Sequence, residues 1–255
     1  MKVKVAIAGS QGRMGQLLVD EVHRAEGLEL VAAFDLIDVG ESLGNGVLVS
    51  DAADLAETLK VTKSDVLIDF TVPSASVDNV KIAASQGVNL VMGTTGFSDV
   101  QKKEMALAIE GNVGAVISPN FSLGVNLFWS LIEVAAKALQ NYDVEVMEAH
   151  HRGKKDAPSG TATKAVEILT QSMNLEEVVY GRRGEGLRGK EIGVHAIRAG
   201  DIVGDHTVLF AGPGERLEIK HQAHSRQAFA SGAVRAAAWV MGASPGIYSM
   251  SDVLK

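Results

Sequence analysis

The first half of the chain alternates short apolar runs with segments of helical periodicity. Apolar runs predict buried strands at residues 3–8, 28–34, 65–70, 88–92 and 113–117. Helices are predicted between them, ending near residue 25, at residues 75–86, and from Ser98 to about residue 111. Buried strands that alternate with helices are typical of an open parallel sheet with helices on both faces.

The second half has a different pattern. Residues 141–149 alternate apolar and polar side chains, which predicts a strand with one buried face. Further strands are predicted at residues 192–198, 207–210 and 217–221, with turns at residues 199–201 and 212–214. Successive hairpins predict a largely antiparallel sheet, so the whole chain is expected to combine an α/β domain with an α+β domain.

Helices and one loop complete the pattern of the second half. Residues 122–139 form an amphipathic helix, and the stripe of Leu123, Leu127, Leu131 and Ile132 is expected to face a core. Residues 181–190 interleave charges with glycines, which predicts an exposed loop. An alanine-rich helix is predicted at residues 227–240.

The first strand runs directly into a glycine turn that opens a helix. This turn is Gly9-Ser10-Gln11-Gly12-Arg13-Met14-Gly15, and the next strand ends at Asp35, twenty residues beyond Gly15. Such a turn lets the backbone approach a pyrophosphate, and an acid at this distance can bind ribose hydroxyls. The pattern predicts a Rossmann-like dinucleotide site, although a strand-turn-helix without a ligand remains an alternative because the spacing is Gly-x-x-Gly-x-x-Gly.

Composition narrows the class of protein. A chain of 255 residues with 46% hydrophobic and 22% charged residues can bury a full core. Its formal net charge of -7 argues against nucleic acid as the main partner. The sequence contains no cysteine, which excludes disulfides and thiolate chemistry. We expect a cytoplasmic protein with no membrane span, because the chain enters a strand at once and the most apolar window, residues 125–139, is interrupted by charges.

The densest chemistry lies in the fifteen residues from Glu148 to Ala162. They hold the adjacent imidazoles of His150 and His151, the amine of Lys154, and a helix start at Ser159-Gly160-Thr161. A helix N-terminus with a lysine beside it is suited to bind a small dianion. The simpler alternative is a strand end with two half-buried histidines, followed by an ordinary helix cap.

This string closely resembles the signature E-L/A-H-H-x-x-K-x-D-A-P-S-G-T-A of the 4-hydroxy-tetrahydrodipicolinate reductase (dihydrodipicolinate reductase) family. The resemblance extends from Val3 to Leu254 and includes four further segments. Residues 198–206 depart from the family pattern only mildly, at Ala199 and Asp205, and are expected to shape the sheet and subunit contacts. The other three segments are Phe70-Thr71-Val72-Pro73, Gly93-Thr94-Thr95-Gly96 and Ser118-Pro119-Asn120-Phe121.

The resemblance implies a reductase of lysine biosynthesis that converts a cyclic hydroxy-dicarboxylate to tetrahydrodipicolinate, with loss of water and hydride transfer from NAD(P)H. It implies that His150 and Lys154 are the acid/base pair, and that His151, Ser159, Gly160 and Thr161 bind the substrate. It also implies a homotetramer, a discontinuous nucleotide domain at residues 1–121 and 231–255, and a substrate-binding and oligomerisation domain at residues 122–230. The implied cofactor-binding residues are Gly9, Ser10, Gln11, Gly12, Arg13, Met14, Asp35, Phe70, Thr71, Gly93, Thr94, Thr95, Ser118, Pro119, Asn120 and Phe121.

The sequence favours NADH over NADPH. Every charged side chain between Asp35 and Lys60 is acidic, whereas a site for the extra phosphate of NADP usually offers an arginine. Leu36 stands where some members of the family carry that arginine. NADPH remains open if Arg13 reaches the phosphate.

Other readings remain open at this point. A different two-domain dehydrogenase shares the predicted architecture, because fold alone does not fix function. A silent nicotinamide-binding sensor would bind the cofactor without consuming it. No metal site is expected from His195, His206, His221 and His224, which lack a cysteine or a helical His-x-x-x-His partner. Feedback regulation, domain closure and the immediate proton donor are not fixed by the sequence.

Overall fold

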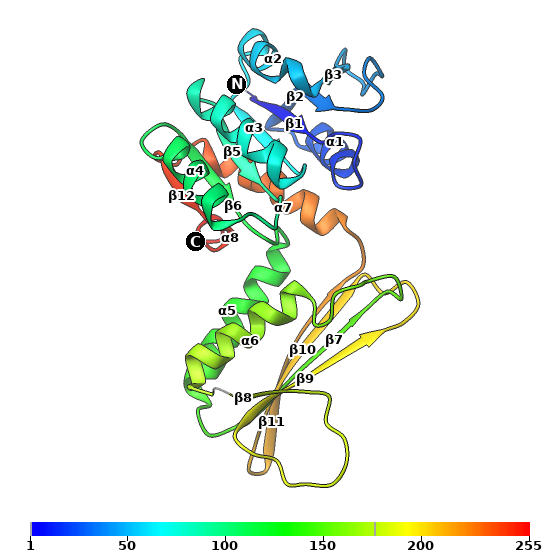
Figure 1. Cartoon of the computed structure of the whole chain (residues 1–255), viewed down its shortest axis with the longest axis vertical. Coiled ribbons are helices and arrows are strands. Elements are labelled where there is room, and N and C mark those ends of the chain that lie inside the picture. The colour runs from blue at the N-terminus through cyan, green and yellow to red at the C-terminus, as the bar shows by residue number, and fades with distance from the viewer. Residues whose placement is uncertain (1, 176) are drawn as a thin grey trace. The chain divides into compact units, whose positions relative to one another are not determined.

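The chain forms two compact units in a computed structural model that describes residues 2–175 and 177–255. Unit 1 consists of the chain up to Leu123 together with Arg226–Lys255, and unit 2 is Gly124–Ser225. Each unit has its own sheet (Figure 1). Within the described residues, no helix is long and apolar enough to cross a membrane.

Unit 1 is built on a seven-stranded sheet in which every pairing between strands is parallel, which confirms the Rossmann-like prediction. The strand order is β12-β6-β5-β4-β1-β2-β3. The chain reverses its direction of travel between β1 and β4, and open α/β sheets bind ligands outside the carboxyl ends of the strands at such a point. The strands are β1 (Val3–Ala8), β2 (Leu28–Asp35), β3 (Val49–Asp51), β4 (Val66–Asp69), β5 (Asn89–Met92), β6 (Gly114–Ile117) and β12 (Gly246–Tyr248).

Helices cover both faces of this sheet. Alternation along β1 directs Val5 and Ile7 into a core shared with α1, α7 and α8, and directs Ala6 and Ala8 into a second core shared with α2, α3 and α4. Both faces of the strands are therefore buried, which explains their continuous apolar runs. The helices are α1 (Gly15–Arg24), η1 (Ala52–Asp54), α2 (Leu55–Thr62), α3 (Pro73–Ser85), α4 (Asp99–Ile109), α7 (Gln227–Val240) and α8 (Met250–Val253).

Unit 2 has a five-stranded mixed sheet in the order β11-β10-β7-β9-β8. The central strand β7 is antiparallel to β10 and parallel to β9. The long helices α5 (Leu123–Ala138) and α6 (Gly160–Met173) pack on one face through a shared apolar core (Figure 1). The strands are β7 (Asp143–His150), β8 (Glu177–Tyr180), β9 (Glu191–Arg198), β10 (Gly204–Gly212) and β11 (Glu215–Ala223).

One predicted hairpin of unit 2 is wrong. The turn at residues 199–201 does not join neighbouring strands, because β7 lies between β9 and β10 and pairs with both. The second predicted hairpin, β10 with β11, is confirmed. A turn pattern shows only that the chain changes direction; it does not show whether a third strand lies between the two arms.

The predicted core stripe of α5 is also partly wrong. Leu127 is 54% exposed and Leu131 is 47% exposed. The buried positions are Val125, Phe128, Ile132 and Ala136, which follow the same helical period from a different starting residue. This helix is apolar on more than one face, so its period alone could not select the buried one.

Candidate functional site

The glycine turn of unit 1 is tightly packed against the start of α1. Gly9 has a φ of +79°, a conformation that favours glycine. A Cβ on Gly15 would overlap the carbonyl oxygen of Gly9, so only glycine lets α1 begin this close to β1. The hydroxyl of Ser10 is buried and donates to the carbonyl oxygen of Phe34. These contacts bring the N-terminus of α1 to the carboxyl ends of β1 and β2, where a phosphate could bind.

Asp35 lies directly beside this turn. Its Oδ2 accepts a hydrogen bond from the backbone N–H of Gln11 at 2.8 Å, and its Oδ1 accepts one from Leu36 at 2.7 Å. The carboxylate borders a cavity of about 260 Å³ whose apolar walls include Phe34 and Leu55. An apolar cavity with a carboxylate at its rim and a glycine turn beside it fits the nucleoside end of a dinucleotide. Leu36 is 81% exposed at the same rim.

A buried carboxylate connects two of the three other predicted cofactor loops. Asp69 is fully buried at the end of β4. Its Oδ1 accepts hydrogen bonds from the backbone N–H and hydroxyl of Thr71 at 2.9 and 2.7 Å, and from the hydroxyl of Thr94 at 3.3 Å. Ser76 and Asn79 on α3 also donate to it. Sequence reasoning missed Asp69, although an acid that ends an apolar strand is a recognisable signal.

Aromatic packing fixes the same loops. The rings of Phe70 and Phe121 lie 5.6 Å apart between centroids, and a Cβ on Gly93 would overlap the ring of Phe70. Ser118 donates to the carbonyl oxygen of Asn120, which keeps the following turn closed. Unit 1 therefore brings together Phe70, Thr71, Gly93, Thr94 and Phe121. Thr95, Pro119, Gly12 and Arg13 are exposed, and Met14 is half-buried.

Unit 2 gathers its polar groups around one buried carboxylate, Glu148. Strand alternation places Glu148 and His150 on the same face of β7 as Val144 and Val146. Glu148 Oε2 lies 2.6 Å from Nδ1 of His150, and its Oε1 accepts a hydrogen bond from the backbone N–H of Ser159 at 3.0 Å. The guanidinium of Arg198 donates to both oxygens, at 2.8 and 2.7 Å. The carboxylate is thus paired on every side.

These contacts set the charges of the pair. Burial raises the pKa of Glu148, but the hydrogen bonds from Arg198 and His150 outweigh it and hold the pKa below its usual value. Burial lowers the pKa of His150, an effect that Glu148 partly offsets and that the positive charges of Lys154 and Arg198 reinforce. At neutral pH the site therefore holds an ionised Glu148 and a neutral His150.

Lys154 and the start of α6 complete the cluster. The ammonium of Lys154 lies 3.0 Å from Asp156 and is partly buried, and its charge acts on His150. Ser159 caps α6 by accepting a hydrogen bond from the backbone N–H of Ala162 at 3.3 Å. Gly160 and Thr161 are the first residues of that helix. The backbone N–H of Lys154 donates to the carbonyl oxygen of His151 and closes a tight turn. All six predicted residues of unit 2 thus lie on the β7–α6 connection or at its two ends.

A row of imidazoles extends from this cluster across the sheet. His206 on β10 is paired in register with Glu148, and His221 on β11 is paired with His206. Nε2 of His206 lies 3.1 Å from the hydroxyl of Ser159, and its ring meets that of His150 edge to face at 5.1 Å between centroids. Burial lowers the pKa of His206 to about 4. No group of three or more histidines or acids suited to a metal ion occurs in residues 2–175 and 177–255.

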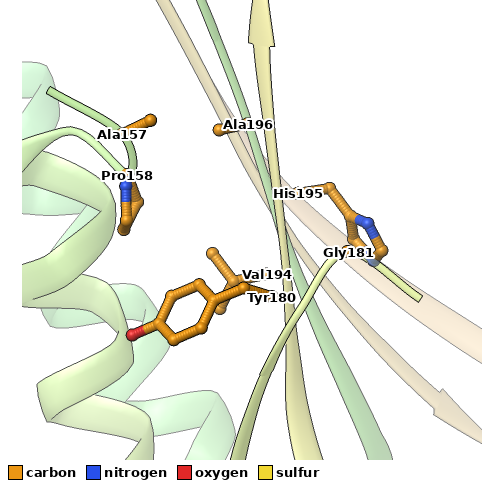
Figure 2. Close-up of a pocket in the computed structure, with 7 residues that line it drawn as sticks. All are labelled: Ala157, Pro158, Tyr180, Gly181, Val194, His195 and Ala196. Atoms are coloured by element: carbon orange, nitrogen blue, oxygen red, sulfur yellow. The ribbon is translucent and has the colours of Figure 1, made fainter. Parts of the chain in front are cut away.

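One cavity of unit 2 borders the β7–α6 connection on another side. It measures about 580 Å³ and is lined by loop residues Ala157 and Pro158, by Tyr180 of β8, and by β9 (Figure 2). Figure 2 shows the ring of Tyr180 projecting towards the helices and the imidazole of His195 turned away from them. His150 and Lys154 do not line this cavity. The candidate residues of unit 2 are therefore gathered around Glu148 and not in this cavity.

Two family models match the chain in succession. The N-terminal model of dihydrodipicolinate reductase matches residues 3–121, and the C-terminal model matches residues 124–254. The chain belongs to the dihydrodipicolinate reductase family.

Curated relatives and a solved structure agree with this membership. The chain is 56% identical to 4-hydroxy-tetrahydrodipicolinate reductase from Methanoculleus marisnigri and 55% identical to that from Methanosarcina barkeri; each match covers 99% of both chains. A dipicolinate-bound dihydrodipicolinate reductase from Paenisporosarcina is 31% identical, with a TM-score of 0.84 and 98% of both chains covered. An amine dehydrogenase from Mycobacterium smegmatis, at 17% identity and a TM-score of 0.63 over 98% of this chain and 95% of that one, shares the fold alone.

Proposed function

We propose that this protein reduces 4-hydroxy-tetrahydrodipicolinate to tetrahydrodipicolinate, with loss of water and with hydride from NAD(P)H, in the diaminopimelate route to lysine. The observation that carries the proposal is the match to the family over both halves of the chain. The residues that the family signature singles out are supported by the local geometry, since His150, Lys154 and the start of α6 adjoin one buried carboxylate.

The nucleotide domain of the proposal is residues 1–121 and 231–255. The backbone of Gly9 to Met14 binds the pyrophosphate, and the carboxylate of Asp35 accepts hydrogen bonds from the ribose hydroxyls. The loops at Phe70-Thr71, Gly93-Thr94-Thr95 and Ser118-Pro119-Asn120-Phe121 line the nicotinamide end. NADH is the preferred cofactor, because Asp35 borders the nucleoside cavity and the exposed Leu36 brings no positive charge for a 2′-phosphate.

The substrate domain of the proposal is residues 122–230. Loss of water from the hydroxy-imine leaves a carbon–carbon double bond conjugated to the imine. When bound, NADH would supply a hydride to the carbon that bore the hydroxyl group. The ammonium of Lys154 neutralises the negative charge that then develops towards the ring nitrogen, and His150 exchanges a proton with the substrate. His151 holds the substrate, and Ser159, Gly160 and Thr161 present the α6 N-terminus to a carboxylate.

The proposal extends to assembly and location. We expect a homotetramer, which the resemblance to the family implies, and the edge strands β8 and β11 of unit 2 offer backbone groups for pairing with another copy. Light scattering should then give about four times the 26.8 kDa mass of one chain. We expect the protein in the cytoplasm, where a chain without cysteine needs no oxidative folding.

A coupled assay tests the proposed function. Pyruvate and aspartate semialdehyde are condensed in the cuvette by the preceding synthase, and the loss of reduced-nicotinamide absorbance is followed with NADH and NADPH in parallel. We expect oxidation that depends on the synthase and is faster with NADH. Cofactor binding without oxidation would instead favour the sensor or another dehydrogenase.

A further inference from the structure

The two ring nitrogens of His150 have different surroundings. Nδ1 faces Glu148 Oε2 at 2.6 Å, and both groups are buried. Nε2 has no hydrogen-bond partner within residues 2–175 and 177–255. Because an ionised carboxylate only accepts hydrogen bonds, the neutral imidazole must carry its proton on Nδ1. Nε2 is then the nitrogen left to take a proton from a bound molecule and to return it.

Glu148 is itself held in place from two other directions. The guanidinium of Arg198 binds both of its oxygens, and the backbone N–H of Ser159 binds Oε1. A second bond from Arg198 to the carbonyl oxygen of Asp156 connects the clamp to the loop that carries Lys154. The carboxylate therefore cannot rotate away from His150 without breaking several charge-assisted hydrogen bonds.

Gly204 leaves the other side of the ring uncovered. A Cβ at Gly204 would lie 3.0 Å from Nε2 of His150, closer than a side chain normally approaches. Gly204 begins β10, next to the strand that carries His150. The absence of a side chain there keeps Nε2 approachable while Nδ1 stays bound to Glu148.

We propose that Glu148, clamped by Arg198, is a positioning residue that fixes the Nδ1–H tautomer of His150 and so assigns proton exchange with the substrate to Nε2. This inference rests on the proposed function for the role of His150. It does not rest on it for the tautomer, which is a property of the free protein. The charged and titratable groups acting on His150 are Glu148 of β7, Lys154 of the loop, Arg198 of β9 and His206 of β10.

The tautomer can be measured directly. We would record solid-state ¹⁵N spectra of protein labelled at histidine, at neutral pH, and identify the His150 signals by their loss in His150→Asn. We expect a protonated Nδ1 and an unprotonated Nε2 in the wild-type protein. A proton on Nε2 would overturn the proposal even if the protein is an active reductase, and the expected tautomer in an inactive protein would refute only the proposed function.

Kinetics of Glu148→Gln provide the second test. A glutamine presents N–H groups to Arg198 or to Ser159, which are themselves donors, so these hydrogen bonds are lost. We expect kcat to fall by about 10²-fold, with the dissociation constant of NADH unchanged. The limb of the pH profile that belongs to His150 should also move to lower pH, because Glu148 raises the pKa of that imidazole. A damaged fold alone would lower activity without moving this limb.

Glu145→Gln is the matched control. Glu145 lies on the same strand and also pairs with a histidine, His195, at 2.9 Å, but on the opposite face of the sheet. We expect its turnover and pH profile to stay within about twofold of wild type, because this half-buried pair lies on the face of β7 opposite to His150. An equal loss in both variants, or wild-type turnover in Glu148→Gln, would contradict the positioning role.

Discussion

Lys154 is the residue of the candidate site whose removal should have the clearest kinetic effect. Lys154→Ala removes the cation that we propose neutralises charge on the substrate after hydride transfer. We expect kcat to fall by about 10²- to 10⁴-fold, the range for a lost general acid, with NADH affinity retained. Steady-state kinetics measure this, and Lys155→Ala, which changes an exposed neighbouring lysine, is the control. Wild-type turnover in Lys154→Ala would remove this residue from the mechanism.

His206 should make the protein less stable in mild acid. Burial lowers its pKa from 6.5 to about 4, so the unfolded chain binds a proton in a range where the folded chain does not. The free energy of unfolding is unaffected by His206 above about pH 6.5. It decreases as the pH falls towards about 4, and the decrease amounts to about 3 kcal/mol. The lowered pKa values of His150 and His221 act in the same direction.

Urea unfolding at pH 7 and pH 5 measures this effect. We expect His206→Phe to lose less stability than the wild type between these two pH values, because it has no imidazole to protonate at this position. A wild-type protein that is equally stable at both pH values would contradict the buried neutral state of His206.

At the scale of single residues, the sequence predicts part of the candidate site. The string from His150 to Thr161 identifies candidate residues, and continuing the strand alternation from Val144 and Val146 would have placed Glu148 on the buried face. A buried acid two residues before a histidine is a readable signal. Arg198 and His206 reach the same cluster through the pairing of β9 and β10 with β7. The register between strands that are distant in the sequence cannot be predicted from a local pattern.

The start of α1 is the element on which the proposed nucleotide site depends. Gly15→Ala places a methyl group against the Gly9 carbonyl, so α1 must shift away from β1. Overpacking of this kind costs about 1–3 kcal/mol, and NADH affinity should fall as the turn opens. Thermal unfolding and NADH fluorescence titration measure the two effects. Gly27→Ala is the control, since nothing lies within 4 Å of its added Cβ; equal behaviour of both variants would contradict the tight turn.

Some helices and strands are easier to predict from the sequence than others. The strands β1, β2, β4, β5 and β6 are buried on both faces, so their continuous apolar runs were predicted correctly. The edge strands β3 and β12 have three residues each and β8 has four, so they are too short to show a repeating pattern of buried positions. In α5, apolar residues lie on several faces, so the sequence did not show which face is buried.

At the scale of the whole molecule, the architecture was predictable but the order of the second sheet was not. The alternation of strands and helices specifies a parallel sheet, because parallel neighbours require a crossover connection. The β9-β7-β10 arrangement depends instead on β7 pairing with two strands that follow it by more than forty residues. The family models match both halves of the chain, so the proposed reaction is argued from the two units together and not from one of them.

The most direct test of that reaction is the identity of the product. Substrate made from pyruvate and aspartate semialdehyde would be supplied with NADH carrying deuterium at the transferable position, and the product analysed by mass spectrometry and NMR. We predict a ring that has lost one oxygen atom and carries one deuterium at the carbon that bore the hydroxyl group. Oxidation of NADH that leaves this oxygen in place, or no transfer of deuterium to the ring, would contradict the proposed reductase.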